Sequence, residues 1–331
     1  MSEEKIYLEI KDLEVVYSQA KKTVRAVNRV SLKLVKGKTL GLVGETGAGK
    51  TTIAKSIMRI LPNPQAKVLG GQIFLDGEDL LEKSEDDMYD IRGTKVAMVF
   101  QDPMTALNPL MTVGDQILEV LMLHNDYNYK EGLKKAGVML ETVGIPAERC
   151  PEYPHQFSGG MKQRVVIAMA LACNPELLLA DEPTTALDVT IQAQVLDLIK
   201  ELKESYNTSM ILITHDLGVV AETCDDVAVI YAGKIVESGS KEDVFDHTAH
   251  PYTLGLFGSL PSVAVGEKRL HPIGGMPPDP TNLPPGCAFW PRCPYATEEC
   301  KEEIKFTILS PGHFCRCIHI DKTHKVLRRK E

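Results

Sequence analysis

The sequence has no long hydrophobic run. Its longest unbroken apolar stretch is Val165–Cys173, nine residues, whereas a membrane-spanning helix needs about 20. The first residues, Met1–Lys5, contain neither the basic nor the apolar segment of a secretory signal. We therefore expect a chain that does not cross a bilayer and stays in the cytosol, where disulfides are rare.

Basic residues are in the minority. The 331 residues include 37 Lys and Arg against 45 Asp and Glu, a net charge of −8. This balance argues against a protein that wraps nucleic acid. Apolar residues at 44% and charged residues at 25% are typical of a globular chain and exclude a disordered or collagen-like one. The length predicts two domains.

Strand and helix patterns alternate along roughly the first 240 residues. Short apolar runs bounded by Gly, Asp or Pro indicate buried parallel strands at Thr39–Val43, Val96–Phe100, Leu177–Ala180 and Met210–Thr214. Residues 7–17 alternate as a half-buried strand does, and residues 226–238 are typical of a hairpin turning at Ala232-Gly233. Helical spacing of apolar residues predicts helices at 50–61, 158–174 and 189–205. This alternation indicates an α/β fold with helices on both faces of a sheet.

Proline is concentrated near the C-terminus. Ten of the 20 prolines lie between Pro251 and Pro294, a density that excludes long helices and central strands. Such a segment buries little apolar surface by itself, so we expect something else to fix its shape. We place a domain boundary near His250, with one domain at 1–249 and a small irregular domain at 250–331.

A phosphate-binding loop lies near the N-terminus. Residues 44–51 fit the pattern G-x-x-x-x-G-K-[ST], follow an apolar strand and open a helix. The glycines allow successive backbone N–H groups to face one anion. Lys50 would contact the β- and γ-phosphates, and Thr51 would bind Mg²⁺. We expect the nucleotide to be bound by Gly44, Glu45, Thr46, Gly47, Ala48, Gly49, Lys50, Thr51 and Thr52.

Two acids end a later apolar strand. At the C-terminal edge of a parallel sheet, Asp181 would hold Mg²⁺, and Glu182 would position and deprotonate an attacking water. A Ser-Gly-Gly-Met sequence at 158–161 opens a predicted helix. Its serine suits an N-cap, and its glycines expose N–H groups to an anion.

Taken in order, these motifs resemble those of the ATP-binding-cassette ATPases. The resemblance implies that family's fold: a parallel-sheet core, an antiparallel β subdomain and a helical subdomain at about 102–175. It implies an adenine-stacking Tyr17, a Q-loop Gln101 that senses Mg²⁺ and the γ-phosphate, and a switch His215. The implied catalytic residues are Glu182, His215 and Gln101, and the implied magnesium site comprises Thr51, Gln101 and Asp181. The signature would be Ser158, Gly159, Gly160 and Met161, and the D-loop Ala186-Leu187-Asp188.

The family's mechanism is nucleotide-driven dimerisation. ATP would lie between one subunit's phosphate loop and its partner's signature, so that the signature of this chain contacts the partner's ATP. Hydrolysis would remove the shared ligand and open the dimer. The expected enzyme is an ATP hydrolase.

The resemblance extends to one subfamily, the oligopeptide and dipeptide importer ATPases. Met161 replaces the usual Gln, as is common there. The C-terminal sequences at 250–254, 259–261, 285–294 and 311–317 are similar as well. The implied role is energy coupling at the cytoplasmic face of the cell membrane. The implied partners are a second, usually different ATPase, two transmembrane permease subunits contacted through Asp102–Leu123, and indirectly an external binding protein; nucleic acid is not among them.

Four cysteines, Cys287, Cys293, Cys300 and Cys317, have five, six and sixteen residues between them. Without a C-x-x-C pair, a zinc finger or ribbon fits poorly. Four thiolates still suit one metal centre, either [4Fe–4S] or zinc. A cluster of this kind is associated with the resembling subfamily, whose pattern favours Cys317 over Cys315. We expect [4Fe–4S], with zinc, or free or disulfide-linked thiols, as alternatives.

The cargo stays open at this point. Nickel and oligosaccharide importers share this ATPase type with peptide importers. A DNA-repair ATPase of the same superfamily is disfavoured, because only 107 residues lie between Lys50 and Ser158 and they carry no sustained heptads.

Overall fold

The computed structural model describes residues 5–19, 22–185, 187–258 and 273–327. The internal contacts of the chain divide it into two compact units. The first includes Val35–Lys38 and Leu80–Ile213, and the second includes Ile6–Leu34, Thr39–Asp79 and the chain from Thr214 onward. The C-terminal segment, residues 250–331, therefore groups with the phosphate loop.

The first unit has a parallel sheet of three neighbouring strands in the order β8-β7-β6. Leu177 of the central strand lies opposite both Val96 and Ser209. Every residue of these strands is buried, as expected when both faces of a parallel sheet are covered. The strands are β6 (Val96–Val99), β7 (Leu177–Asp181) and β8 (Ser209–Thr214).

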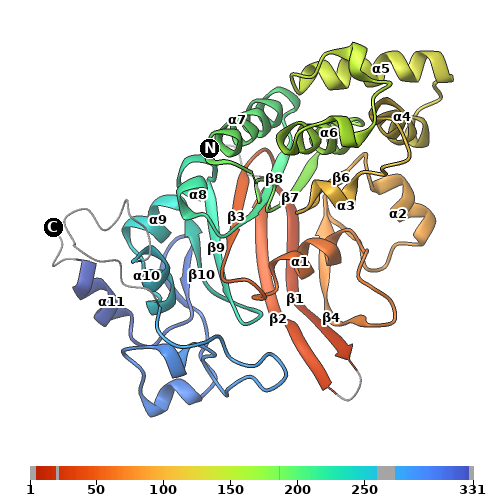
Figure 1. Cartoon of the computed structure of the whole chain (residues 1–331). Coiled ribbons are helices and arrows are strands. Elements are labelled where there is room, and N and C mark those ends of the chain that lie inside the picture. The colour runs from red at the N-terminus through yellow and green to blue at the C-terminus, as the bar shows by residue number, and fades with distance from the viewer. Residues whose placement is uncertain (1–4, 20–21, 186, 259–272, 328–331) are drawn as a thin grey trace. The chain divides into compact units, whose positions relative to one another are not determined.

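Helices make up most of the rest of this unit. Thr112, Asn128 and Ser158 begin three of them as N-caps whose side chains accept a backbone N–H. Helices α4, α5 and α6 pack on one another, as Figure 1 shows. The helices are α2 (Glu85–Ile91), α3 (Pro103–Ala106), α4 (Val113–His124), α5 (Tyr129–Thr142), α6 (Gly159–Leu171) and α7 (Val189–Tyr206), with 3₁₀ turns at Ala147–Arg149 and Pro154–Gln156.

The second unit contains an antiparallel sheet in the order β2-β1-β4-β5. Leu8 pairs with Leu75 and Tyr17 with Ala66 along the central ladder. This sheet is the antiparallel β subdomain that the family resemblance implied. Its strands are β1 (Ile6–Gln19), β2 (Lys22–Val35), β4 (Ala66–Leu75) and β5 (Glu78–Asp79).

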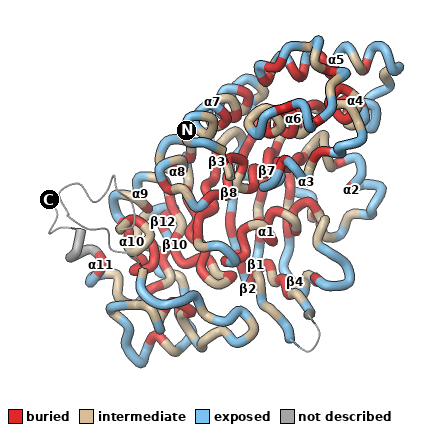
Figure 2. The backbone as a smooth tube through the Cα atoms, viewed as in Figure 1, coloured by how far each residue is buried: buried red, intermediate tan, exposed pale blue. Residues whose placement is uncertain are grey.

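A second run of strands in this unit has the order β3-β9-β10-β12-β11. The parallel β3–β9 ladder is buried, as Figure 2 shows. The predicted hairpin is confirmed, because Ala232 and Gly233 both have positive φ angles, 47° and 79°, as a tight hairpin turn requires. The strands are β3 (Thr39–Val43), β9 (Asp226–Tyr231), β10 (Lys234–Ser240), β11 (Thr307–Ser310) and β12 (His313–Cys315).

Short helices complete the second unit. In the C-terminal segment they are brief, as its proline content predicts. They are α1 (Lys50–Ile57), α8 (Leu217–Thr223), α9 (Lys241–Asp246), α10 (Pro251–Phe257) and α11 (Ile320–Leu327), with 3₁₀ turns at Trp290–Arg292 and Glu298–Lys301. Within the residues that the structure describes, no helix is both long and apolar enough to span a membrane. Ser259–Pro261, part of the importer resemblance, lies outside those residues.

Glu237 of β10 anchors the C-terminal segment. Its carboxyl group is fully buried and accepts the backbone N–H groups of Ala249 and His250 at 2.7 and 2.9 Å. A third contact, at 3.1 Å, joins it to Nε2 of His313 on β12. One carboxyl group therefore bonds both to the backbone N–H groups at the start of α10 and to a side chain of β12, the strand that extends the sheet.

His250 shares this environment. Its Nδ1 accepts the N–H of Tyr252 at 3.0 Å and so caps α10. Complete burial lowers the pKa of the imidazole to about 3, because desolvation disfavours the charged ring. His250 is therefore a neutral capping residue at physiological pH.

Candidate functional site

The phosphate loop connects β3 to α1. Gly49 begins the helix with φ 108°, in the left-handed region that favours glycine. A Cβ atom at this position would lie 2.3 Å from the carbonyl oxygen of Ala26. Both the conformation and the close approach thus require glycine at the last position before Lys50.

Lys50 points back over the loop. Its side chain is nearly buried, 5% exposed, and its Nζ donates to the carbonyl oxygens of Gly44 and Glu45 at 2.7 and 3.1 Å. Thr46 and Gly47, at the tip of the loop, are exposed. A fixed ammonium beside an exposed glycine-rich turn at a helix N-terminus is an arrangement that binds phosphate.

Two other predicted site residues, Tyr17 and His215, belong to the second unit, as the phosphate loop does. The hydroxyl groups of Tyr17 and Thr52 are 3.4 Å apart, which places the expected adenine-stacking residue beside the first turn of α1. His215 is exposed directly after β8. Asp216 next to it caps α8 by accepting the N–H groups of Gly218 and Val219.

Glu182, in the first unit, lies at the centre of a polar cluster. Its Oε2 accepts from Nε2 of Gln101 at 2.8 Å and from Oγ1 of Thr185 at 2.9 Å. Its backbone is left-handed, with φ 45°, a conformation that costs a non-glycine residue energy and is found preferentially at functional sites. The preceding Asp181 ends β7 and is 2% exposed. The structure thus brings together the expected base and the expected Q-loop residue, whereas no motif in the sequence pointed to Thr185.

The signature residues start α6. The side chain of Ser158 accepts the N–H of Met161 at 3.4 Å, while Ser158 and Gly159 are exposed. At Gly160 a Cβ atom would lie 2.5 Å from Cγ2 of Ile191 on α7, so this glycine allows the two helices to approach. The N–H of Met161 is used by this cap, whereas the first N–H groups of a helix have no intrahelical acceptor and can face an external anion.

The D-loop leads into α7. Asp188 occupies the N-cap position of that helix and is exposed, and its side chain makes no capping hydrogen bond. Ala186 of the same motif lies outside the described residues.

Each of the four predicted cysteine ligands accepts a hydrogen bond from a backbone N–H group. Cys317 Sγ accepts the N–H of His319 at 3.2 Å, and Cys300 Sγ that of Thr297 at 3.5 Å. Burial raises the pKa of Cys287 and of Cys293, and backbone N–H groups that donate to each thiol offset part of this. Amide donation to sulfur is typical of thiolates that bind iron–sulfur clusters.

The thiols also influence one another. The pKa of Cys317 is raised to about 12, chiefly by burial; Cys287, Cys293 and Cys300 contribute in the same direction, and the N–H of His319 lowers it. Yet no three His, Cys, Asp or Glu side chains come close enough to hold one metal ion, within the described part of the chain. Cys315 is fully buried in a small apolar cluster with Ala249 and Cys317.

Residues far from the motifs, none of them predicted from the sequence, also contact the expected functional segments. Arg292 and Tyr252, of the C-terminal segment, both contact Glu45 of the phosphate loop. Gln116 is buried and bonds with its side chain to the backbone of Asn108 and Met111, fixing the segment expected to dock on membrane subunits. The one feature of the sequence that could have indicated the contacts of Gln116 is a glutamine on the otherwise apolar side of α4.

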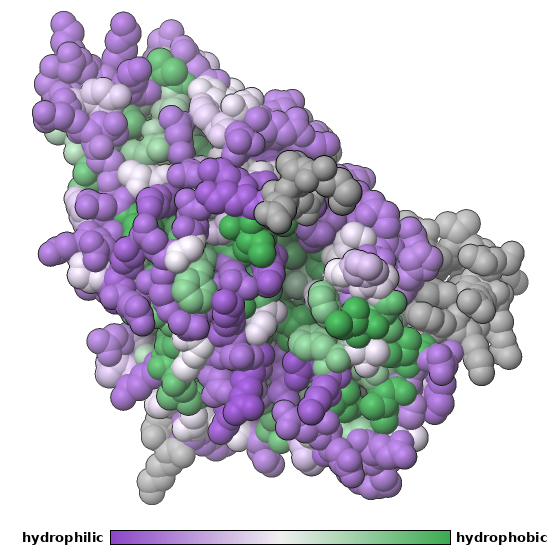
Figure 3. Space-filling model, turned by 180° about the vertical axis from the view of Figure 1, so that it is seen from behind, coloured by the Kyte–Doolittle hydropathy of each residue, from purple (hydrophilic) through white to green (hydrophobic). Residues whose placement is uncertain are grey.

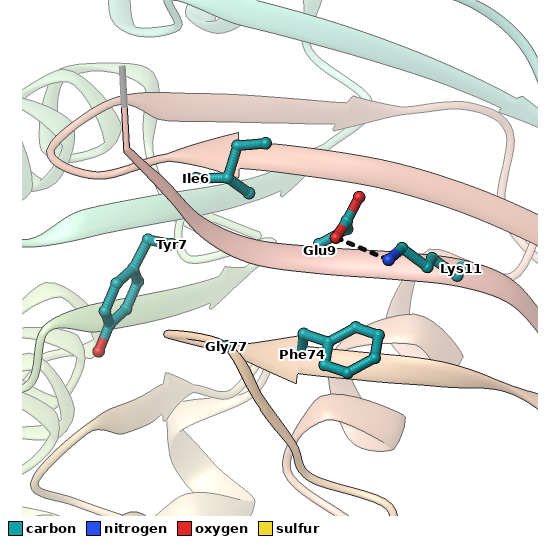
Figure 4. A pocket seen from close by; sticks show the side chains of 6 residues that line it. All are labelled: Ile6, Tyr7, Glu9, Lys11, Phe74 and Gly77. Carbon is teal, nitrogen blue, oxygen red and sulfur yellow. Dashed lines mark ion pairs between the residues drawn. The ribbon is translucent and has the colours of Figure 1, made fainter. Parts of the chain in front are cut away.

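A hollow on the antiparallel sheet, shown in Figure 4, carries charges that are already paired. Glu9 contacts Nζ of Lys11 and of Lys33, each at 3.1 Å. These hydrogen bonds lower the pKa of the Glu9 carboxyl group. The ring of Phe74 lies against Lys11, 4.7 Å from its Nζ. The one carboxylate of the hollow is therefore already shared by two ammonium groups.

Single apolar residues are exposed over the coupling segment, which we define as residues 102–123. Leu110 is 85% exposed and Met104 63%. Elsewhere, the face drawn in Figure 3 is largely hydrophilic, with apolar side chains in separate patches.

Comparison with known proteins gives consistent matches. Residues 27–185 match the family described as ABC transporter, and residues 236–300 match the C-terminal region of oligopeptide/dipeptide transporters. The dipeptide transport ATP-binding protein DppD of Bacillus subtilis is 50% identical over 313 residues, covering 94% of this chain and 93% of the relative. The oligopeptide transport ATP-binding protein OppD of Escherichia coli is 46% identical over 312 residues, covering 94% and 92%.

Solved structures agree. The ATP-binding cassette MJ0796, solved as a dimer in a post-hydrolysis state with ADP and Pi, matches with a TM-score of 0.64 and 27% identity. The match covers 71% of this chain and 98% of that one.

Proposed function

The chain belongs to the ATP-binding-cassette family, as an ATPase subunit of the dipeptide and oligopeptide importer type, and we propose that it drives the import of di- and oligopeptides. The main observation in support of ATP hydrolysis is the geometry of the phosphate loop. The Nζ of Lys50, held by the carbonyl oxygens of Gly44 and Glu45, would contact the β- and γ-phosphates, and its fixed position supports this role. Tyr17, beside the same loop, would stack on the adenine.

Hydrolysis itself would depend on Glu182. Gln101 and Thr185 orient its carboxylate, which would take a proton from the attacking water. Mg²⁺ would neutralise phosphate charge, held by Thr51, Gln101 and Asp181. The hydroxyl, amide and carboxylate oxygens of this set suit such a hard cation. His215 would contact the γ-phosphate.

A second ATPase subunit would complete the site. The exposed N-terminus of α6, with Ser158, Gly159, Gly160 and Met161, would contact the partner's ATP rather than this chain's own. Asp188 would lie at the same interface. We expect a heterodimer in the transporter and a homodimer when the chain is isolated. ATP would close the dimer, and hydrolysis would reopen it.

The coupling segment would attach this dimer to two permease subunits at the cytoplasmic face of the cell membrane. Its exposed Leu110 and Met104 offer apolar contacts to a membrane-subunit loop, and Gln116 holds the segment rigid. An external binding protein would act only indirectly, through the permease.

The cargo can be tested with the whole transporter reconstituted in proteoliposomes. ATP hydrolysis should rise when the external binding protein carries a di- or oligopeptide. Nickel or an oligosaccharide should give no such rise. Stimulation by nickel or by an oligosaccharide alone would replace the peptide assignment with one of those cargoes.

We also propose that Cys287, Cys293, Cys300 and Cys317 hold a [4Fe–4S] cluster. Zinc would require at least three of these sulfurs to converge on one point at about 2.3 Å, and the described thiols do not converge in this way. In a cubane each thiolate binds a different iron, so such convergence is not needed. The cluster would cross-link the core-poor C-terminal segment.

Cysteine substitutions test the cluster. Anaerobically prepared protein should contain about four iron atoms per chain and show broad visible absorbance. Cys293→Ser should lose most of both. Cys224→Ser is the matched control, since that buried thiol lies outside the C-terminal segment and its substitution should leave iron content unchanged. Colourless, iron-free and stable native protein would exclude the cluster, and one zinc per chain would support the alternative.

A further inference from the structure

Arg292 of the C-terminal segment is paired with the phosphate loop. Its Nη1 lies 2.7 Å from Oε2 of Glu45, and its Nη2 lies 3.0 Å from Oε1. The two residues are 247 positions apart in the sequence. Such a two-pronged guanidinium–carboxylate pair is the strongest and most directional of side-chain ion pairs.

The guanidinium itself is fixed. Nη1 also donates to the hydroxyl group of Tyr231 at 3.1 Å, and Nε donates to the carbonyl oxygen of Gly274 at 3.0 Å. The Arg292 side chain is only 5% exposed, whereas that of Glu45 is 28% exposed. Arg292 is therefore the rigid partner, and it determines where the Glu45 carboxylate lies.

A second contact holds the backbone of the same residue. The N–H of Glu45 donates to the hydroxyl oxygen of Tyr252 at 2.9 Å. Tyr252 is fully buried, and its ring lies 4.5 Å from that of Tyr231 and 5.3 Å from that of Phe289. Both the main chain and the side chain of Glu45 are thus held by the C-terminal segment.

Glu45 is an acidic residue inside a loop built to bind an anion. An unpaired carboxylate there would repel the nucleotide phosphates, and the repulsion acts strongly over a few ångströms at a partly buried site. Pairing with Arg292 cancels this charge and ties the carboxylate to the C-terminal segment. The pair therefore removes a penalty that the loop sequence would otherwise impose on ATP binding.

We propose that Arg292 is a positioning residue of the phosphate loop, which neutralises and orients Glu45 so that the C-terminal segment sets the affinity for ATP. The inference rests on the proposed binding of ATP by this loop. It does not depend on the cargo or on the cluster.

A double-mutant cycle in the full-length chain tests the charge argument. Arg292→Gln should weaken MgATP binding about 10- to 100-fold, because the Glu45 carboxylate is left unpaired. Glu45→Gln should tighten binding by up to about fivefold, since the charge of Arg292 beside the phosphate loop is then uncompensated. The double variant should return to within about threefold of the native dissociation constant. The loss in Arg292→Gln should shrink as salt is raised.

Two outcomes would overturn the proposal. One is native affinity in Arg292→Gln, and the other is a double variant that binds as weakly as Arg292→Gln alone, which would mean that Arg292 acts through the fold. If Arg292→Gln does not fold, Arg292→Lys replaces it as the test. Lysine keeps the charge but not the two-pronged geometry, so this variant should bind MgATP severalfold more weakly than the native chain. Native or undetectable binding of MgATP by Arg292→Lys also counts against the proposal. Arg29→Gln is the matched control, because Arg29 is an exposed arginine paired with Glu14.

A separate variant tests the premise. Lys50→Ala should abolish MgATP binding whether or not Glu45 and Arg292 are present. If Lys50→Ala still binds MgATP, the assignment of the loop as the ATP site fails first, independently of the role given to Arg292.

Discussion

Replacing Glu182 with Gln is expected to lower kcat for ATP hydrolysis by about 10²- to 10⁴-fold, the usual contribution of a positioned general base. The substitution is nearly isosteric, and the Gln side-chain oxygen can still accept from Gln101 and Thr185, as Oε2 of Glu182 does at 2.8 and 2.9 Å. The local structure should therefore persist. What is lost is the group that takes the proton of water, so ATP should bind normally and remain uncleaved.

The consequence of this block is a trapped dimer. Since ATP is the shared ligand in the proposed mechanism, the Glu182→Gln variant should elute as a stable dimer with MgATP and as the native species without it. Steady-state turnover and size-exclusion chromatography measure the two effects. Glu176→Gln is the matched control, because Glu176 is an exposed carboxylate paired with Lys36. Native turnover in Glu182→Gln would show that another group is the base.

The phosphate loop could be predicted from sequence because its information is local. Eight successive positions, an apolar strand before them and a helix after them determine both backbone and chemistry, and β3 and α1 occur where expected. Only the end of α1 differs. The helix stops at Ile57 and not at Leu61. Arg59 adopts a left-handed φ of 51°, so the helix ends before the apolar periodicity of the sequence does.

The antiparallel strands were harder to predict from the sequence. Strand β2 contains four Lys or Arg residues among fourteen and has one exposed face, so its apolar alternation is interrupted at Arg25, Asn28 and Arg29. Strand β4 places two glycines, Gly70 and Gly71, in its centre. Such strands are defined by pairing with β1, a contact between distant residues.

The contacts of the C-terminal segment are non-local for the same reason. Neither Glu45 nor Arg292 is unusual in its own neighbourhood, and no periodicity joins residues 247 positions apart. Sequence analysis identified the cysteines because their chemistry is distinctive. It could not identify the residues that attach this segment to the sheet.

Glu237 is the residue on which that attachment depends most. Replacing it with Ala would leave the buried N–H groups of Ala249 and His250 without their acceptor and remove the contact to His313. Each buried group left unsatisfied costs about 1–3 kcal/mol, so we expect a loss of about 3–5 kcal/mol in the free energy of unfolding. Glu237→Gln retains an acceptor oxygen and should lose about half as much.

Trp290, the one tryptophan of the chain, makes the effect measurable. It lies in the C-terminal segment, so its fluorescence follows unfolding of that segment, while far-UV circular dichroism follows the whole chain. In urea, Glu237→Ala should shift the fluorescence midpoint to lower denaturant and ahead of the dichroism midpoint, because the segment detaches first. Glu201→Ala, an exposed change on α7, should alter the free energy of unfolding by no more than about 0.5 kcal/mol and so leave both midpoints close to native. A fluorescence midpoint in Glu237→Ala equal to that of Glu201→Ala would show that other contacts hold the segment in place.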